Sequence, residues 1–524
     1  MLLAKPKPTA ATPFFVHDSD PGMVAGTRST VKTDRLLIKA GAIYLSVLAI
    51  FQLLLGADGL VVAGFCFAAF LGVAASAAAG GFRTIIGALC LIHVLKVLLV
   101  ALLLKSILLE TVESNLFAPV ETAGMLAWGY ASLLLASLAA RFWLFPSRFL
   151  RRGVFMTLLP NNAQFLLALG LSFFLCGTVF SFIGGAYIDQ AGGGLGLIKT
   201  LAGYKGFCVS CFIFYSHAKG RRAILLNPLV MGTLVLLTVL GVISTSKQGI
   251  LEPAFFAGLA YYSIRGFQWK RYLILGILAF FAAQYIINPF TQTAKMVNMS
   301  AGGRSSGKET LKAFAKNATD SSVREDNIAR IDDMEEFDKK SYFNENVYIL
   351  SRLALVYEQS WLVSASVDPS QRSGWFTIDW GFDMLWPRFL KPDKPAGSAA
   401  PWLGSFSGIT GSDDDATSIS FGYMANFYNA FGNQGVVIGG FLTAFFLFLL
   451  VSFAFGFNRS GGIFWVFGVT ALHHNFVEAV FSSLLPLIYI PFIFAIYCLI
   501  AWFTAKFLMP SANHPGSPMP RRSR

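Results

Sequence analysis

Three ionisable residues, His473, His474 and Glu478, stand close together in a stretch that is otherwise apolar. Ionisable groups inside a bilayer are costly, so each is a candidate for function. In a helix, the spacing of four places His474 and Glu478 on the same face. A carboxylate beside an imidazole holds one tautomer of the ring and raises its basicity, as a general base acting on a hydroxyl requires. A structural hydrogen-bonded pair would give the same pattern.

Lysines also fall in apolar stretches. Lys199 and Lys205 lie on one predicted helix, and His93 and Lys96 lie one turn apart on another. A buried ammonium group without a partner would lose its charge, so each lysine needs a carboxylate, a carbonyl or a bound anion. An anionic lipid headgroup would suit Lys199 and Lys205. Pairing with Glu252, or snorkelling to the membrane surface, is the simpler interpretation.

The string from Trp386 to Pro395 concentrates three cations between prolines that restrict the backbone. Arg388 could bind a diphosphate through two parallel hydrogen bonds, while Lys391 and Lys394 would add point charges. A basic rim that touches anionic lipid is the alternative. Three consecutive Asp at 413 to 415 could bind a divalent cation, but such a run is more often solvated, so we predict no metal site.

The composition indicates a membrane protein, because 55% apolar and 13% charged residues leave too little polar surface to cover a soluble 524-residue globule. Residues 291 to 434 hold 14 Lys and Arg against 18 Asp and Glu, so the rest of the chain carries a net charge of +17. That excess falls in short loops and tails, which is typical of orientation in a membrane and not of nucleic-acid binding. The six cysteines lie in apolar stretches and indicate neither disulfides nor a zinc site.

We predict an all-α polytopic membrane protein with about twelve transmembrane helices and one large, partly helical periplasmic loop. A span needs about 20 largely apolar residues. The predicted spans are 37–56, 58–79, 84–104, 123–144, 164–185, 195–216, 223–243, 249–265, 271–290, 435–457, 462–482 and 484–506.

The loops between these spans alternate in charge. The basic loops and tails contain Lys32, Arg35, Arg83, Arg148, Arg151, Arg152, Lys219, Arg221, Arg222, Lys270, Arg271, Arg459, Arg521, Arg522 and Arg524. The opposite side contains Asp58, Glu110, Glu113, Glu121, Asp189 and the large loop. Because cytoplasmic loops carry an excess of Lys and Arg, we expect both termini in the cytoplasm and the large loop outside.

The chain then divides into five parts. These are a cytoplasmic N-terminal tail (1–36), spans one to nine (37–290), the large extracytoplasmic loop (291–434), spans ten to twelve (435–507) and a basic cytoplasmic tail (508–524). The loop is too long for a simple connector, so it should fold. Its run 344–362 has helical spacing and carries Arg352. From Gly374 onward, Trp, Pro and Gly interleave, which is typical of a lid lying on the outer membrane surface.

The late, large outer loop, the string Pro387 to Pro395 and the stretch Ser418 to Gly440, with Asn426 and Gly432 in it, carry a family resemblance. Together they resemble the Wzy-type oligosaccharide repeat-unit polymerases, the O-antigen and exopolysaccharide polymerase group. The pattern covers roughly the second half of the chain, whereas the first nine predicted spans are similar only in kind.

The resemblance implies transfer of a growing glycan from one polyprenyl diphosphate carrier to another lipid-linked repeat unit, in the bacterial cytoplasmic (inner) membrane. Loop arginines would bind the diphosphate, here Arg352 and Arg388, and neither a metal nor another cofactor is needed. Trp380 and Tyr423 would stack on sugar rings, and Asn426 would join the substrate site. The partners implied are the lipid-linked oligosaccharide, membrane lipid, and chain-length regulator and flippase proteins.

One departure concerns the base. The related O-antigen ligases place a histidine in the large loop, and this loop contains none, so His473 and His474 are the nearest substitutes. Two other functions stay open: a ligase that delivers glycan to another acceptor, and a flippase or transporter of lipid-linked sugars. Transporters usually show internal repeats and discontinuous helices near the membrane midplane, and we see no repeat here.

Overall fold

The computed structural model describes residues 26–144, 153–159, 162–187, 201–221, 223–243, 247–266, 342–344, 353–386, 390–395, 397–411, 419–456 and 462–508, with a few isolated positions between them. All secondary structure in these ranges is helical. Seven of the helices are long and apolar enough to cross a membrane: Arg35–Leu54, Gly59–Ala78, Ile85–Ile107, Pro119–Leu144, Ala163–Phe180, Gly422–Phe455 and Phe481–Lys506.

This finding confirms the prediction of an all-helical protein suited to a membrane. Shorter helices, α10 (Phe207–Ala218), α11 (Pro228–Ile243) and α12 (Lys247–Arg265), fall at the predicted sixth, seventh and eighth spans. Most of the predicted ninth span, most of 291–341, residues 1–25 and residues 509–524 lie outside the described residues, while the end of the predicted N-terminal tail, 26–36, is the start of helix α1. The number twelve therefore stays a prediction.

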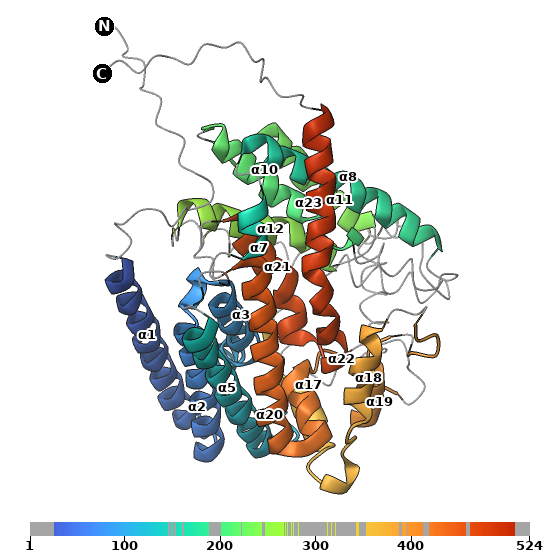
Figure 1. Cartoon of the computed structure of the whole chain (residues 1–524). Coiled ribbons are helices and arrows are strands. Elements are labelled where there is room, and N and C mark those ends of the chain that lie inside the picture. Colours follow the sequence, from blue (N-terminus) through green and yellow to red (C-terminus); the bar gives the residue numbers. More distant parts are fainter. Residues whose placement is uncertain are drawn as a thin grey trace, which may run out of the picture.

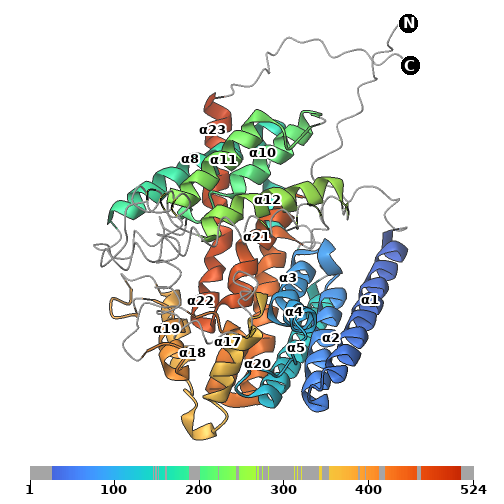
Figure 2. The same ribbon diagram turned by 180° about the vertical axis from the view of Figure 1, so that it is seen from behind.

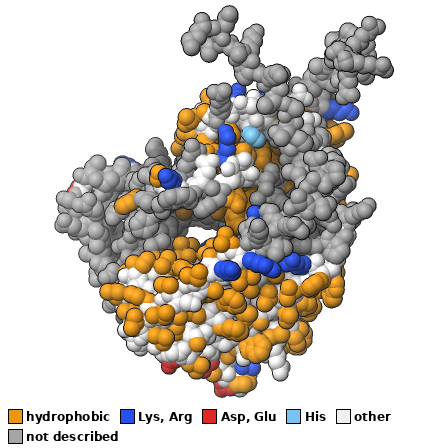
Figure 3. Space-filling view, turned by 90° about the vertical axis from the view of Figure 1, so that its left-hand side faces the viewer, with side chains coloured by type: hydrophobic (Ala, Val, Ile, Leu, Met, Phe, Trp, Pro, Cys, Tyr) orange, Lys and Arg blue, Asp and Glu red, His pale blue; other side chains and the backbone are white. Residues whose placement is uncertain are grey.

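The first helices present a wide apolar surface. α1 (Gly26–Leu54) packs on α2 (Gly59–Ala78), and its outward side exposes Ile43, Val47 and Leu54. Figure 3 shows this face covered with apolar side chains, with Lys and Arg along one border and Asp and Glu at the opposite end. An uncovered apolar face of this size is stable only in lipid or against another protein.

The third span is irregular at its middle. It runs from α3 (Ile85–Val94) through a π-helical turn, Leu95–Leu99, into α4 (Val100–Ile107). At its start, the Thr84 hydroxyl accepts a hydrogen bond from the Gly87 amide at 2.9 Å, which satisfies one of the donors that a helix leaves open. α5 (Pro119–Ala139) follows and continues to Leu144. Single π turns are frequent at functional sites.

A second group of helices packs at the end of the bundle away from the helices between Val356 and Ser407 (Figure 1). It contains α8 (Ala163–Tyr187), α10, α11 and α12. The short α7 (Val154–Leu158) packs against α20 (Gly422–Phe455). From behind, α12 lies between the pair α10 and α11 and helix α21 (Ile463–Glu478) (Figure 2).

The helices of the large loop lie together at one end of the molecule, which we call the loop end (Figure 1). They are α17 (Val356–Ser364), α18 (Phe376–Leu385) and α19 (Ala400–Ser407). α17 is not a surface helix, because it packs against α5 and α20 and most of its residues are buried. Part of the loop therefore belongs to the core of the bundle.

Helix α20 (Gly422–Phe455) doubles back on itself. Gly432 has φ 65° and ψ −152°, a conformation that only glycine adopts without strain. Gly129 of α5 lies against Met424. Ser132, one turn further along α5, lies against Gly440. Because Met424 and Gly440 would be about 24 Å apart in a continuous helix, the chain must reverse at Gly432. We call residues 422–431 the first limb and 433–455 the second limb.

The predicted eleventh span is broken. α21 (Ile463–Glu478) stops at Glu478, Ala479 and Val480 are extended, and α22 (Phe481–Leu484) starts anew. The 16 residues of α21 reach about 24 Å, which is less than the hydrocarbon core of a bilayer. A 3-10 turn, Leu485–Tyr489, leads into α23 (Ile490–Leu508).

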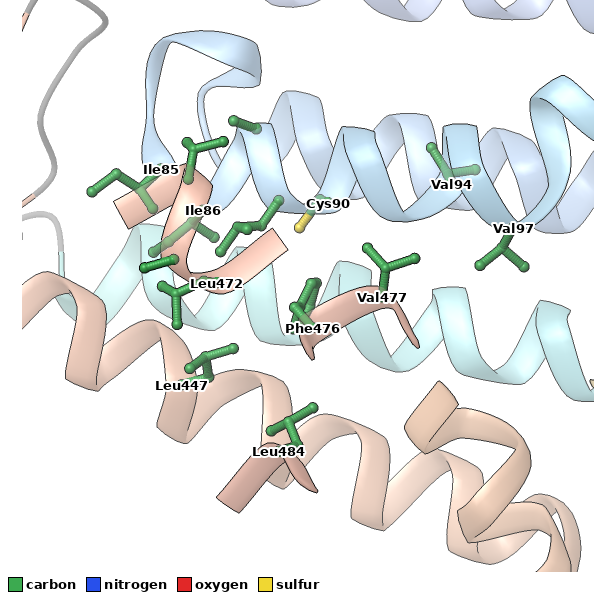
Figure 4. Close-up of a cluster of buried hydrophobic side chains, with 14 of the residues drawn as sticks. Ile85, Ile86, Cys90, Val94, Val97, Leu447, Leu472, Phe476, Val477 and Leu484 are labelled. Atoms are coloured by element: carbon green, nitrogen blue, oxygen red, sulfur yellow. The ribbon is translucent and has the colours of Figure 1, made fainter. Parts of the chain in front are cut away.

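The core of the bundle forms where α3, α20 and α21 meet. Figure 4 shows Ile86 and Cys90 of α3 facing Leu472 and Phe476 of α21, and all four side chains are buried. This packing places the end of α21 beside the middle of the third span.

A buried ion pair ties the loop to the first helices. The Lys105 ammonium donates to Glu110 Oε2 and to Ser114 Oγ, each at 2.6 Å, and the two charged side chains are 0% and 7% exposed. The Tyr342 ring lies 4.4 Å from the Lys105 ammonium, and its hydroxyl donates to the Val112 carbonyl at 2.7 Å. Burial raises the pKa of Tyr342 well above its usual value, so this hydroxyl stays a donor.

Replacing Lys105 by Met should destabilise the protein by about 3–5 kcal/mol, because the Glu110 carboxylate would stay buried without a counter-charge. The measurement is thermal unfolding in detergent. The double variant Lys105→Met/Glu110→Met should recover much of the loss. The exposed Lys219 is a matched control, and Lys219→Met should leave the unfolding temperature unchanged. Equal effects of the two single lysine variants would contradict this role.

Candidate active site

A charged cluster lies at the middle of the third span. Lys96 is the central residue of the Ile85–Ile107 span, and its ammonium forms an ion pair with Glu478 Oε1. The same oxygen lies 3.2 Å from His474 Nδ1. The other oxygen, Oε2, accepts a hydrogen bond from the Ser420 hydroxyl at 3.1 Å. The predicted contact of His474 with Glu478 is present, and the partner of Lys96 is a carboxylate, one of the three kinds of partner that the sequence left open.

Three helix ends converge on this cluster. The Leu355 amide, just before α17, donates to the Lys96 carbonyl at 3.4 Å. A methyl group on Gly422, the first residue of α20, would lie 3.1 Å from the Val477 carbonyl of α21. Neither α17 nor α20 has a side-chain cap, and the positive N-terminal end of a helix favours a nearby carboxylate. The end of α21 and the starts of α17 and α20 thus meet beside Lys96 and Glu478.

Gln359 is an unpaired polar group beside the cluster. Its side chain is fully buried, and neither its amide nitrogen nor its amide oxygen has a hydrogen-bond partner. A methyl group on Gly422 would lie 3.0 Å from the Gln359 nitrogen. A buried amide of this kind is usually satisfied by an ordered water or by a ligand hydroxyl.

The cluster is reachable from outside, since the His474, Lys96 and Glu478 side chains are 44%, 20% and 15% exposed. His473 points away, with Nδ1 2.9 Å from the Thr470 carbonyl and its ring tilted at 43° to the Phe255 ring of α12, 4.8 Å between centroids. The adjacent histidines therefore have different surroundings, and only His474 contacts the carboxylate.

Lys205 lies in another part of the bundle. Its backbone and Cβ pack on Gly177 of α8, and Glu252 is the charged group that acts on it. A methyl group on Gly206 would lie 3.3 Å from Glu252 Oε1. Glu252 therefore interacts electrostatically with Lys205, but these two described side chains form no ion pair within 4.0 Å. Lys199 lies outside the described residues.

An apolar groove of about 990 Å³ follows the second limb of α20. Its walls are the second limb, α18 and the segment Phe481–Ile488, and the polar side chains on it are Gln434 and Thr443. Phe427 of the first limb packs against Gly439, which opens the wall because glycine has no side chain. From Gln434 to Phe453 the groove is about 28 Å long, close to the thickness of a bilayer core.

Arg372 lies at the loop end of this groove. A methyl group on Gly432 would be 2.6 Å from its Nη1, so the guanidinium rests on the reversal of α20. Phe431 and Gln434, which flank Gly432 in the sequence, line the groove, whereas Arg372 itself lies next to the groove and is not one of its lining residues. Arg372 Nε donates to the Ser366 carbonyl at 3.1 Å, and the guanidinium lies over the Tyr428 ring at 5.6 Å. No carboxylate in the described part of the chain forms an ion pair with it.

Acidic groups lie near this arginine without neutralising it directly. Asp368 interacts electrostatically with Arg372, and Glu121 acts in the same way on Tyr428. Both carboxylates are exposed. A hydrogen bond from the Ser370 amide lowers the pKa of Asp368 below its usual value, so its charge persists at neutral pH.

The groove and arginine together suit one kind of ligand, a long apolar chain that ends in an anionic group. Apolar area drives the chain into the groove, and the planar guanidinium binds phosphate or carboxylate oxygens in pairs. No family model, curated protein or solved structure matches this chain. Its function must therefore be argued from this chemistry.

The predicted loop cations are mostly engaged within the protein. Lys391 forms an ion pair with Asp383, and the Lys394 ammonium donates to the Trp386 carbonyl at 2.7 Å. The Trp380 indole donates to the Gly397 carbonyl at 2.8 Å. Arg352 and Arg388, the predicted diphosphate ligands, and the Asp run at 413–415 lie outside the described residues.

Asn426 and Tyr423 do not form the predicted sugar surface. The Asn426 amide donates to Thr377 Oγ1 at 3.0 Å, and its oxygen accepts from the Phe481 amide at 3.0 Å, which caps α22. Tyr423 has no exposed area and packs against the rings of His93 and Phe476. The prediction that Tyr423 contacts sugar is wrong in this structure, because the first limb of α20 is buried in the bundle.

Sequence reasoning missed Arg372 and Gln359. Arg372 is one of several loop arginines, and nothing local distinguishes it from Arg352 or Arg388. The resemblance implied a loop arginine in general, which was the only available signal. Gln359 stands in a predicted amphipathic run where a glutamine is ordinarily solvated.

The ion pair at mid-depth should show energetic coupling. We expect Lys96→Met and Glu478→Gln each to destabilise the protein, and the double variant to lose less than the sum, with a coupling energy of at least about 1 kcal/mol. Thermal unfolding of the four proteins in detergent measures this. The control is the same double-mutant cycle on Lys391 and Asp383, that is, the two single variants and the double variant. Their side chains are 43% and 29% exposed, so the coupling energy should be smaller. Strict additivity at Lys96 and Glu478 would refute the pair.

Proposed function

We propose that this chain joins polyprenyl-diphosphate-linked oligosaccharide repeat units into O-antigen or exopolysaccharide, as Wzy-type polymerases do. The supporting observation is the apolar groove with Arg372 at its loop end. A polyprenyl chain fits the groove, and the diphosphate that follows it meets an arginine without an ion-pair partner in the described residues. Such a site binds both parts of the carrier lipid of the donor, the apolar polyprenyl chain and the anionic diphosphate.

The proposal places the loop end at the outer face of the bacterial cytoplasmic membrane. The supporting pattern is the basic character of the opposite loops, which favours a cytoplasmic location for them and for both termini. Twelve spans are part of this proposal. In this orientation, the loop end faces the side of the membrane on which the lipid-linked oligosaccharides are joined.

The chemistry needs little more than charge stabilisation and a proton acceptor. A sugar hydroxyl attacks the anomeric carbon of the donor, the bond from that carbon to the diphosphate breaks, and the guanidinium of Arg372 stabilises the departing diphosphate. Polyprenyl diphosphate is already a good leaving group. The hydroxyl proton passes to a base within hydrogen-bonding reach.

The position of Arg372 changes the assignment of that base. The His474 and Glu478 cluster lies at the start of the first limb of α20, and Arg372 at its far end, about 15 Å away. An imidazole at that distance cannot take a proton from a hydroxyl beside the diphosphate. The exposed carboxylates Asp368 and Glu121 are nearer, and one of them is the proton acceptor in this proposal.

Arg372→Ala should lower polymer formation about 10- to 100-fold, the equivalent of one charge-assisted hydrogen-bonding group of about 1.5–3 kcal/mol. Arg372→Lys should retain part of the activity, because it keeps the charge but not the paired geometry. The measurement is polymer length and amount from purified lipid-linked repeat units in vesicles.

Arg141 provides the matched control, since it is exposed and lies outside the loop. Arg141→Ala should polymerise like the unmodified chain. Full-length polymer from Arg372→Ala, in protein that elutes normally on size exclusion, would remove Arg372 from the site. In the same assay, loss of polymer with His474→Ala but not with Glu121→Gln or Asp368→Asn would identify His474 as the proton acceptor.

A flippase or transporter is the second candidate, and one observation favours it. The break after Glu478 and the uncapped starts of α17 and α20 meet beside Lys96, as discontinuous helices do at transport sites. The ligase alternative shares the chemistry of the polymerase but uses another acceptor.

Deletion of the gene separates the three functions by the lipid-linked pool it leaves. We expect single repeat units to accumulate on the outer leaflet, because export would continue while joining stops. Single units held on the inner leaflet would indicate a flippase. Finished polymer held on the carrier would indicate a ligase. The measurement is mass of the lipid-linked glycans combined with their access to an external glycosidase.

A further inference from the structure

Helix α18 and its flanking residues expose a group of large apolar side chains, which is unusual for a loop in water. Four aromatic residues at or beside it, and one leucine after it, have large exposed fractions. These are Trp375 (65%), Phe376 (49%), Phe382 (49%), Trp386 (54%) and Leu390 (59%). An apolar patch of this kind marks a binding surface or a membrane contact.

The exposed residues form one stripe. Trp375, Phe382 and Trp386 recur at spacings of seven and four, which places them on the same side of the helix, with Asp379 between them. The opposite side is fixed against the bundle. A methyl group on Gly381 would lie 2.7 Å from the Phe481 ring, so the backbone of α18 packs directly on this ring and the helix cannot rotate to bury the stripe.

Contacts with the last span set the height of α18. The Tyr489 hydroxyl, just before α23, donates to the Leu385 carbonyl. The Ala399 amide donates to Ser482 Oγ at 2.9 Å. Ser482 is the second and Tyr489 the ninth of the 26 residues in the apolar span Phe481–Lys506. The stripe therefore lies level with the first third of a membrane-length helix, which includes its end.

We propose that the stripe of Trp375, Phe382 and Trp386 is embedded in the interfacial layer of the lipid leaflet at the loop end. Tryptophan is enriched at this layer because its ring is apolar while its indole N–H seeks a polar partner. Lys391 and Lys394 follow the stripe, but their ammonium groups bind Asp383 and the Trp386 carbonyl, so the tryptophans alone account for the preference for this layer. An interface with a protein would not need tryptophans at the level of a span end.

The position of the groove supports the same occupant. Trp375 and Phe382 are both part of the groove wall, so the stripe and the groove share side chains. Across the groove, Ile438 and Phe446 of α20 are 62% and 61% exposed. The groove thus opens sideways between α18 and the second limb of α20, toward the same leaflet that the stripe enters. An amphiphile can move from the leaflet into the groove without leaving lipid.

This inference does not depend on the polymerase proposal. It requires that the chain spans a membrane, and it holds for any amphiphile that occupies the groove. Failure of glycan polymerisation would leave it standing, and a stripe found in water would leave the Arg372 site standing.

Tryptophan quenching by brominated lipid tests the proposal on the full chain, reconstituted in phosphatidylcholine vesicles. The fluorescence of Trp375 and Trp386 is obtained as the difference between the unmodified chain and the variant Trp375→Phe/Trp386→Phe. This variant keeps the stripe apolar. We expect bromines at carbons 6 and 7 to quench this component roughly twofold more than bromines at carbons 11 and 12, because the interface is shallow. Aqueous iodide should not quench it.

Two results would overturn the proposal. Quenching by iodide and not by lipid would place the stripe in water, and quenching by neither would mean that protein covers it. The buried Trp465 is the control, and the component lost in Trp465→Phe should respond to no quencher.

A second measurement does not rely on replacing tryptophan. A spin label at Phe382→Cys, in a chain whose six native cysteines are replaced, should be more accessible to oxygen than to a water-soluble nickel chelate. A label at the exposed Ser370 should show the reverse order. Greater accessibility to the nickel chelate than to oxygen at Phe382→Cys would reject an embedded stripe.

Discussion

The ion pair of Lys96 and Glu478 is the interaction on which the middle of the bundle depends. Hydrocarbon offers no water to satisfy a helix that ends within a membrane, so such ends must be paired inside the protein. Here α21 ends and α17 and α20 begin at one depth, beside one lysine and one carboxylate. The opposite charges and the Ser420 hydroxyl make that convergence possible.

Hydrogen bonds along the first limb of α20 connect this region to the loop end. Asn426 joins α18 to α22, and Asn429, one turn further, bonds Ser366 and Ser373 at 2.8 and 2.6 Å. These bonds hold the segment that carries Arg372 against the reversal at Gly432. The groove and its guanidinium are consequences of that reversal, since a straight α20 would separate them.

The two polar regions of the molecule differ in chemical character. In the cluster at mid-depth, the charged groups are paired within the protein. The Glu478 carboxylate binds the Lys96 ammonium, the His474 ring and the Ser420 hydroxyl. Arg372 is held by a carbonyl and an aromatic ring, which position a guanidinium without neutralising it. That difference is the reason for placing anion binding at the loop end and a mainly structural role at Lys96 and Glu478.

The sequence by itself determined the helical class, most span positions and the contact of His474 with Glu478, because hydropathy and helical periodicity are local properties. It also required a partner for Lys96 without naming it. Only the tertiary structure decided that Glu478 is that partner, that α20 reverses at Gly432, and that Tyr423 is buried. Hydropathy cannot distinguish a helix that crosses a membrane from one that turns back, since both are apolar. Arg372 became a candidate only when residues far apart in the chain were brought together.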